Sequence, residues 1–140
     1  MFNPNDSFET RVKQWQEFRC RLETAQDPIQ TAIEHYSQAP WVSIHTDPYN
    51  RESWPNPWQL LKENCYCDFC NLLGIGYSLQ LTERFSHEQF EIHIKRSTKK
   101  HHTYYLLYIG DRVVGYTGDT HVAKSELCPE LDTQQKYILF

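Results

Sequence analysis

The sequence has no long apolar run and only a small surplus of charge. No segment approaches the roughly 20 apolar residues that a membrane-spanning helix needs, so no membrane partner is expected. The N-terminal stretch MFNPNDSFETRVKQWQEF is polar and lacks the apolar core of a signal peptide, which argues against export by that route. A net charge of −4 argues against a general nucleic-acid binder.

Internal repeats, low-complexity tracts and an obvious linker are also absent from the sequence. A chain of 140 residues is most simply one domain, and a domain near this size hides roughly 68% of its unfolded surface. It can therefore build a core without metal or disulfide staples. Aromatic residues, at 14% of the chain, can supply much of the buried area. We expect a single domain over residues 1–140, with residues 1–40 as a helical segment and residues 41–140 as an α+β core.

Cysteines are few and are not arranged in separated pairs. The sequence contains Cys20, Cys65, Cys67, Cys70 and Cys128. This is an odd number, and in a chain that is not exported such cysteines are expected to be reduced thiols. The bland interpretation is that they pack as small buried hydrophobes. On this interpretation the chain has neither a metal nor a cofactor.

Zinc is the alternative for the cysteine cluster at residues 65–70. A structural zinc needs four ligands, usually as two separated pairs, and the sequence has no second pair. A distant fourth ligand could come from Cys128, His87, His121 or Cys20. If zinc is present, the set that we predict is Cys65, Cys67, Cys70 and Cys128.

Two helices are predicted in the first 40 residues. Asp6 and Glu9 have the spacing of a capping box, and the apolar stripe that follows predicts a helix over Ser7–Ala25. Asp27 as the cap and Pro28 at the first helical position begin the second helix. This helical segment either packs on the domain as a hairpin or projects from it as an assembly arm.

The longest apolar segment is Trp54–Leu81, WPNPWQLLKENCYCDFCNLLGIGYSLQL. Asn56 can cap a helix that begins at Pro57, and the apolar residues beyond the cysteine cluster recur at helical spacing. We therefore expect one buried central helix over this segment. Gly74 and Gly76 lower helix propensity, so they predict a place where the backbone of another element approaches closely.

Alternation of apolar and polar residues predicts the strands. The predicted strands are Trp41–His45, Phe90–Lys95, Thr103–Ile109, Arg112–Thr117 and Lys136–Phe140. Thr103–Ile109 is dense in aromatic and β-branched residues and is expected to be the central strand. Gly110–Asp111 has the signature of a two-residue hairpin turn. The whole order predicts an α+β fold, with N-terminal helices and a buried central helix packed on a small antiparallel sheet.

One set of residues resembles the transglutaminase-like branch of the papain-like cysteine enzymes. A cysteine lies near the start of a buried helix, His102 opens the aromatic strand, and Asp119 closes the next hairpin of TYYLLYIGDRVVGYTGD. The resemblance implies a papain-like layout in which Cys67 or Cys65 is the nucleophile, His102 takes its proton and Asp119 orients the imidazole.

The spacing departs from that family at the cysteine. The family commonly places its nucleophile two residues before an Asp-Phe pair, and here Tyr66 occupies that position. Cys65 and Cys67 lie one residue to either side. An offset of one residue on a helix turns a side chain by ~100°, enough to aim it away from His102.

A second resemblance covers most of Trp41–Phe140. The stretches DPYNRESWPNPWQLL, YCDFCNLLGIGYSLQLTERF and YYLLYIGDRVVGY resemble small proteins encoded by tailed bacteriophages, especially those of cyanobacteria. This resemblance implies a non-enzymatic structural component of a virion, located in the neck, tail or baseplate and assembled in the host cytoplasm. Its partners would be other virion proteins in a multi-copy assembly, and it would act through protein–protein contacts.

Three hypotheses for the function follow, in this order. The first is the structural virion protein, for which Tyr49 and Trp54 in a proline-rich loop are the predicted contact residues, whereas Trp58 and Tyr105 are predicted to fill the core. The second is a cysteine hydrolase or acyltransferase that uses the residues named above. The third is a zinc-stabilised interaction module.

Overall fold

The structure, a computed structural model, describes residues 1–139 and divides the chain into two compact units, Met1–Ser86 and a second unit that begins at His87. The first unit is helical and the second is a sheet, so the predicted α+β class is confirmed. The boundary between the units follows Ser86, not residue 40. Within residues 1–139, no helix combines the length and the apolar character needed to cross a bilayer.

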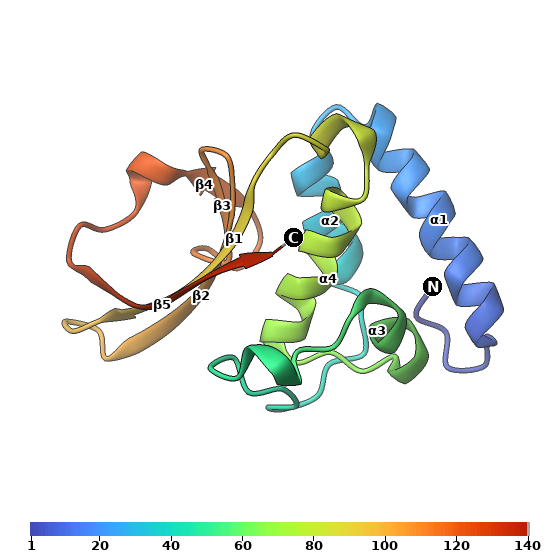
Figure 1. Ribbon diagram of the computed structural model, residues 1–140, viewed down its shortest axis with the longest axis horizontal. Helices are drawn as coiled ribbons and strands as arrows, with labels where there is room; N and C mark the ends of the chain where they lie inside the picture. The colour runs from blue at the N-terminus through green and yellow to red at the C-terminus, as the bar shows by residue number, and fades with distance from the viewer. Residues whose placement is uncertain (140) are drawn as a thin grey trace. The chain divides into compact units, whose positions relative to one another are not determined.

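The first unit contains four α-helices (Figure 1). They are α1 (Phe8–Thr24), α2 (Pro28–Tyr36), α3 (Pro57–Glu63) and α4 (Asp68–Gln80). Helix α1 packs on the other three, and α2 also packs on α4. The two N-terminal helices therefore belong to the same packed unit as α3 and α4.

Capping explains where the first two helices begin. The Ser7 hydroxyl accepts a hydrogen bond from the Thr10 amide at 3.2 Å, so Ser7 is the N-cap of α1 and the predicted cap at Asp6 is wrong by one residue. The prediction for α2 is confirmed, because Asp27 accepts from the Gln30 amide at 3.1 Å and Pro28 occupies the first turn.

The segment predicted as one central helix forms two helices. The start of α3 is as predicted, with a complete capping box between Asn56 and Gln59. Helix α3 then ends at Glu63, and its C-cap, Asn64, adopts a left-handed conformation with φ of 50°. Asparagine is among the few residues that tolerate this conformation, and it stops the helix before the cysteine cluster. Helix α4 begins afresh, with Cys67 as its N-cap.

The predicted strand Trp41–His45 is wrong, because the break between α3 and α4 leaves it only a short partner. Its pairing is limited to an isolated bridge between Trp41 and Tyr66, in which the Val42 amide donates to the Tyr66 carbonyl at 3.0 Å. Tyr66 lies in the short connection between α3 and α4, so it offers no length of strand to pair with. The chain turns away after the bridge, and Ile44 is 93% exposed.

The close approach predicted at Gly74 occurs, but a side chain of α2 makes it and not a backbone. A Cβ atom at this position would lie 2.5 Å from Cε1 of Tyr36, so the absence of a side chain lets α2 and α4 pack closely. Such proximity is a packing reason for accepting the low helix propensity of glycine. The ring of Tyr36 is buried at this contact.

The second unit is a five-stranded sheet in which every pair of neighbouring strands is antiparallel. Its strands, in chain order, are β1 (Phe90–Ser97), β2 (His102–Ile109), β3 (Arg112–Val114), β4 (His121–Ala123) and β5 (Leu131–Leu139). The spatial order is β4-β3-β2-β1-β5, so the predicted central position of β2 is confirmed.

Strands β1 and β2 are one or two residues longer than predicted, β3 and β5 differ from the prediction by more, and β4 was not predicted. The hairpin at Gly110–Asp111 is confirmed, with Gly110 at a φ of 59°. Strand β3 stops at Val114, before Gly115 with its φ of 103°. Strand β5 starts five residues earlier than the predicted Lys136, and its exposed polar residues pair along β1. Strand β4 has three residues, too few to show an alternating pattern.

Both faces of the sheet bury apolar side chains. On one face Leu106, Tyr108 and Val113 form a cluster, against which Tyr116 and Leu127 pack. The register of β1, β2 and β5 defines the residues of the other face. Buried on that face are Phe90, Ile92, Ile94, Leu107 and Leu139.

Candidate functional site

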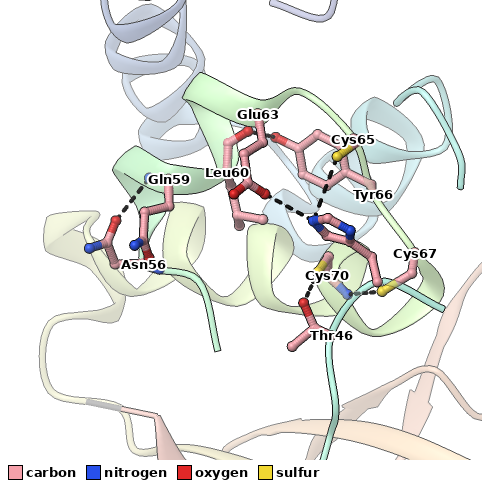
Figure 2. Close-up of polar contacts among 10 residues, drawn as sticks. Thr46, Asn56, Gln59, Leu60, Glu63, Cys65, Tyr66, Cys67 and Cys70 are labelled. Atoms are coloured by element: carbon pink, nitrogen blue, oxygen red, sulfur yellow. Dashed lines mark hydrogen bonds and ion pairs between the residues drawn. The ribbon is translucent and has the colours of Figure 1, made fainter. Parts of the chain in front are cut away.

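Three potential ligand side chains converge in the first unit. His45 Nε2 lies 3.0 Å from Glu63 Oε2 and 3.7 Å from Cys65 Sγ, and the three atoms all lie within 4.8 Å of one another. In Figure 2, dashed lines join the side chains of Glu63 and Cys65 to one imidazole, that of His45. We call these residues the His45–Glu63–Cys65 cluster.

The end of α3 explains this convergence. Glu63 is the last residue of α3, and Cys65 follows the left-handed Asn64. The reversal at Asn64 brings the side chains on either side of it to the loop that carries His45. That loop is held to the same connection by the Trp41–Tyr66 bridge, so backbone pairing fixes the imidazole near the turn.

The geometry of the cluster does not activate a nucleophile. Glu63 and Cys65 both contact Nε2 of His45, whereas a relay needs the carboxylate on one ring nitrogen and the thiol on the other. Partial burial, the Glu63 carboxylate and Cys67 together raise the pKa of the Cys65 thiol. A raised pKa keeps this thiol protonated at neutral pH, which lowers its reactivity.

Cys67 and Cys70 form a separate sulfur pair at the start of α4. Cys67 is the N-cap, and its sulfur accepts a hydrogen bond from the Cys70 amide at 3.4 Å. The hydrogen bond from the Cys70 thiol, with further hydrogen bonds from the backbone amides of Cys70, His45 and Thr46, lowers the pKa of the Cys67 thiol. The same thiol–thiol hydrogen bond and burial raise the pKa of Cys70.

Burial separates this pair from solvent. Cys67 is 5% exposed and Cys70 is fully buried, and the Thr46 hydroxyl lies 3.1 Å from the Cys70 sulfur. Figure 2 shows Thr46, Cys67 and Cys70 grouped below the connection, away from Cys65. The sulfur of Cys67 thus accepts a hydrogen bond at the N-terminus of α4, as an Asp or Ser oxygen does at other helices.

The predicted catalytic residues divide between the two units. Cys65 and Cys67 belong to the first unit, whereas His102 and Asp119 belong to the second. His102 is exposed at the start of β2, with its ring edge against Tyr104 at 4.5 Å between centroids, and Asp119 lies in the loop between β3 and β4. Within the first unit, the imidazole of His45 lies beside the thiol of Cys65.

The predicted zinc ligands are divided in the same way. Cys128 belongs to the second unit, whereas Cys65, Cys67 and Cys70 belong to the first. Within residues 1–139, the group with ligand atoms close enough to share an ion contains Cys65 alone of these four. Its other members, His45 and Glu63, carry no motif spacing in the sequence, which explains why they were missed.

The predicted contact residues behave differently from each other. Tyr49 is 50% exposed. Trp54 is only 7% exposed, because its ring packs against Phe69 and the Arg51 guanidinium covers it at 4.6 Å, so the prediction that Trp54 offers a contact surface is wrong. Trp58, predicted to fill the core, is 47% exposed and touches Trp15 only edge-on.

The sequence matches no known protein-family model and no curated protein.

Proposed function

We propose that the chain is a non-enzymatic structural protein that acts through protein–protein contacts made by residues 41–49. One observation carries this proposal. Within this stretch Trp41 is 65% exposed, Ile44 is 93% exposed and Tyr49 is 50% exposed. Large apolar side chains that gather on a surface mark interaction sites, and aromatic residues are enriched where proteins meet. We call this stretch the 41–49 loop.

The loop is held in place rather than loosely attached. The Trp41 indole donates to the Asp68 carboxylate at 3.0 Å, and the Val42 amide donates to the Tyr66 carbonyl. Further along, the buried Thr46 hydroxyl contacts the Cys70 sulfur. A surface that is already ordered loses less conformational entropy when it binds, so these contacts favour a binding role.

We propose further that this structural protein belongs to a virion. The resemblance to tailed-phage proteins supports a place in the neck, tail or baseplate of a virion, with other virion proteins as the partners. The cysteine hydrolase is not favoured, because the thiol that contacts an imidazole has a raised pKa and shares one ring nitrogen with a carboxylate.

The test uses the natural particle. The chain should co-purify with intact virions, detected by mass spectrometry, and the variant Ile44→Asp should be lost from them. Ile138→Asp is the matched control, because Ile138 is also exposed, at 56%, but lies on β5 outside the loop. A chain that is absent from virions, or an Ile44→Asp variant retained as well as the control, contradicts the proposal.

A stable contact should also have a measurable size. Interfaces of standard size bury about 800 Å² on each partner. The 41–49 loop should therefore lie inside a surface of at least this extent when the assembled particle is imaged. A loop that faces solvent in the particle contradicts the proposal.

A further inference from the structure

We propose that the His45–Glu63–Cys65 cluster is a binding site for a zinc ion. This inference goes beyond the proposed function and does not depend on the chain's partners. It starts from the convergence of an imidazole nitrogen, a carboxylate oxygen and a thiol sulfur within 4.8 Å of one another. These are the three side-chain types that bind zinc in proteins.

The distances fit one shared ion. Zinc binds imidazole nitrogen and carboxylate oxygen at about 2.0–2.2 Å and sulfur at about 2.3 Å, so tetrahedral ligands lie roughly 3.4 Å (nitrogen to oxygen) and 3.6 Å (nitrogen to sulfur) apart. The corresponding separations are 3.0 Å and 3.7 Å. Small rotations of partly exposed side chains are enough to admit the ion.

The orientation of His45 also fits a ligand. Glu63 and Cys65 both contact the same ring nitrogen, Nε2. A metal bound to that nitrogen would therefore lie on the side of the ring where the carboxylate and the thiol already are. Binding of the ion would release the proton of the Cys65 thiol, and the resulting thiolate and the Glu63 carboxylate would balance the charge of a divalent ion. The side chains of His45 and Glu63 are 39% and 47% exposed, so water can reach the fourth position.

The remaining sulfurs of the cysteine cluster have other roles. Cys67 caps α4 and accepts a hydrogen bond from the Cys70 amide, and Cys70 is fully buried beside Thr46. The proposed site therefore uses one thiol. It joins the 41–49 loop, through His45, to the connection between α3 and α4, so the ion would fix one side of that loop.

The direct test is a zinc titration of the reduced, metal-free full chain, in competition with a chromophoric chelator. We expect one zinc per chain. His45→Gln, Glu63→Gln and Cys65→Ser should each weaken binding by at least about tenfold, since even changes to outer-shell partners cost 10–100-fold. The matched controls are His87→Gln and Cys128→Ser, which should leave the affinity unchanged.

Two results would overturn the inference. One is an affinity that Cys65→Ser leaves unchanged. The other is a zinc site that is abolished by Cys128→Ser. Substitution with cobalt gives an independent readout, because the thiolate-to-cobalt charge-transfer band should vanish in Cys65→Ser and persist in Cys128→Ser.

A measurement on the wild-type chain avoids dependence on variant folding. Bound zinc should slow alkylation of Cys65 by iodoacetamide at least about tenfold, because a sulfur that is bound to zinc is not free to attack the reagent. The rate is measured by mass spectrometry. Cys20 is exposed on α1 and serves as the internal control, with an unchanged rate. Equal rates at Cys65 with and without zinc would overturn the inference.

Discussion

The indole nitrogen of Trp15 donates a hydrogen bond to the hydroxyl of Ser78, 2.9 Å away and 63 residues further along the chain. The Tyr36 hydroxyl lies 3.0 Å from the same oxygen, and Ser78 in turn donates to the Gly74 carbonyl at 2.8 Å. One small side chain of α4 therefore joins α1 and α2 inside the core. Burial raises the pKa of Tyr36, so its hydroxyl remains a proton donor.

Removing the hydroxyl should therefore destabilise the chain. In Ser78→Ala, the buried Trp15 and Tyr36 donors lose their shared acceptor, and we expect a loss of about 2–4 kcal/mol in the free energy of unfolding. The measurement is equilibrium unfolding in urea. Ser86→Ala, which removes an exposed hydroxyl, should stay within about 0.5 kcal/mol of wild type. A loss in Ser78→Ala no larger than in this control would mean that the network contributes nothing.

Gly74→Ala should destabilise the chain although alanine is the better helix former. The new Cβ would lie 2.5 Å from Cε1 and 2.9 Å from Cζ of Tyr36, a rigid ring whose hydroxyl is held by Ser78. We expect a net cost of about 1–3 kcal/mol from overpacking, measured by thermal or urea unfolding. Gly118→Ala is the control, because no atom lies within 4 Å of its added Cβ. Equal stability of Gly74→Ala and wild type would show that α2 can move away freely.

Arg11→Lys should destabilise the chain although it keeps the positive charge. The buried guanidinium donates to the carbonyls of Leu61, at 3.1 Å, and of Asn3, at 3.1 Å, so it ties the end of α3 to the N-terminal segment. A lysine cannot reproduce this fork, and we expect a loss of about 1.5–3 kcal/mol in the free energy of unfolding. Lys13→Ala, on the exposed side of α1, should change it little. Unfolding curves for Arg11→Lys that overlay wild type would contradict the role of the fork.

Acid should weaken the chain through His35. Its ring stacks on Phe18 at 3.8 Å, and burial, with help from Arg21, lowers the pKa of His35 to about 4. The unfolded chain therefore binds the proton more readily, so stability is complete above about pH 6.5 and falls as the pH drops towards 4. We expect this part of the loss to be about 1–2 kcal/mol, since His35 is only partly buried and solvent screens its charge.

The variant His35→Phe isolates that contribution. It should flatten the dependence of stability on pH between about 6.5 and 4, because phenylalanine can stack but cannot bind a proton. His87→Gln, at an exposed position, should retain the wild-type dependence. A His35→Phe curve as steep as that of His87→Gln would show that other groups cause the acid sensitivity.

The parts of the fold that the sequence predicted are those governed by local rules. The cap at Asp27, the capping box at Asn56 and the turn at Gly110 each depend on residues within a few positions of one another. The break at Asn64 was missed, because the apolar spacing continues on both sides of it and the left-handed conformation leaves no mark on that spacing.

The site was predicted only in part, for the same reason. Cys65 stood out because it lies in a cluster of cysteines. His45 and Glu63 are 18 residues apart, and the contact between them depends on the Trp41–Tyr66 bridge, which no local pattern announces. The sequence predicted an exposed Trp54 and a buried Trp58, and the structure shows the reverse. Their burial depends on tertiary packing, because Phe69 covers the ring of Trp54 whereas Trp15 of α1 meets the ring of Trp58 only at an edge.

The order of the strands has a consequence for how the sheet is completed. Strand β5 is the last of the five along the chain, yet it pairs with β1, the first, along its full length. Until β5 has been synthesised and has docked, the backbone donors and acceptors along one side of β1 have no partner, and such an open edge invites pairing between chains. Truncated or slowly translated chains should therefore aggregate through β1. Pairing with β5 protects the edge of β1 from such association.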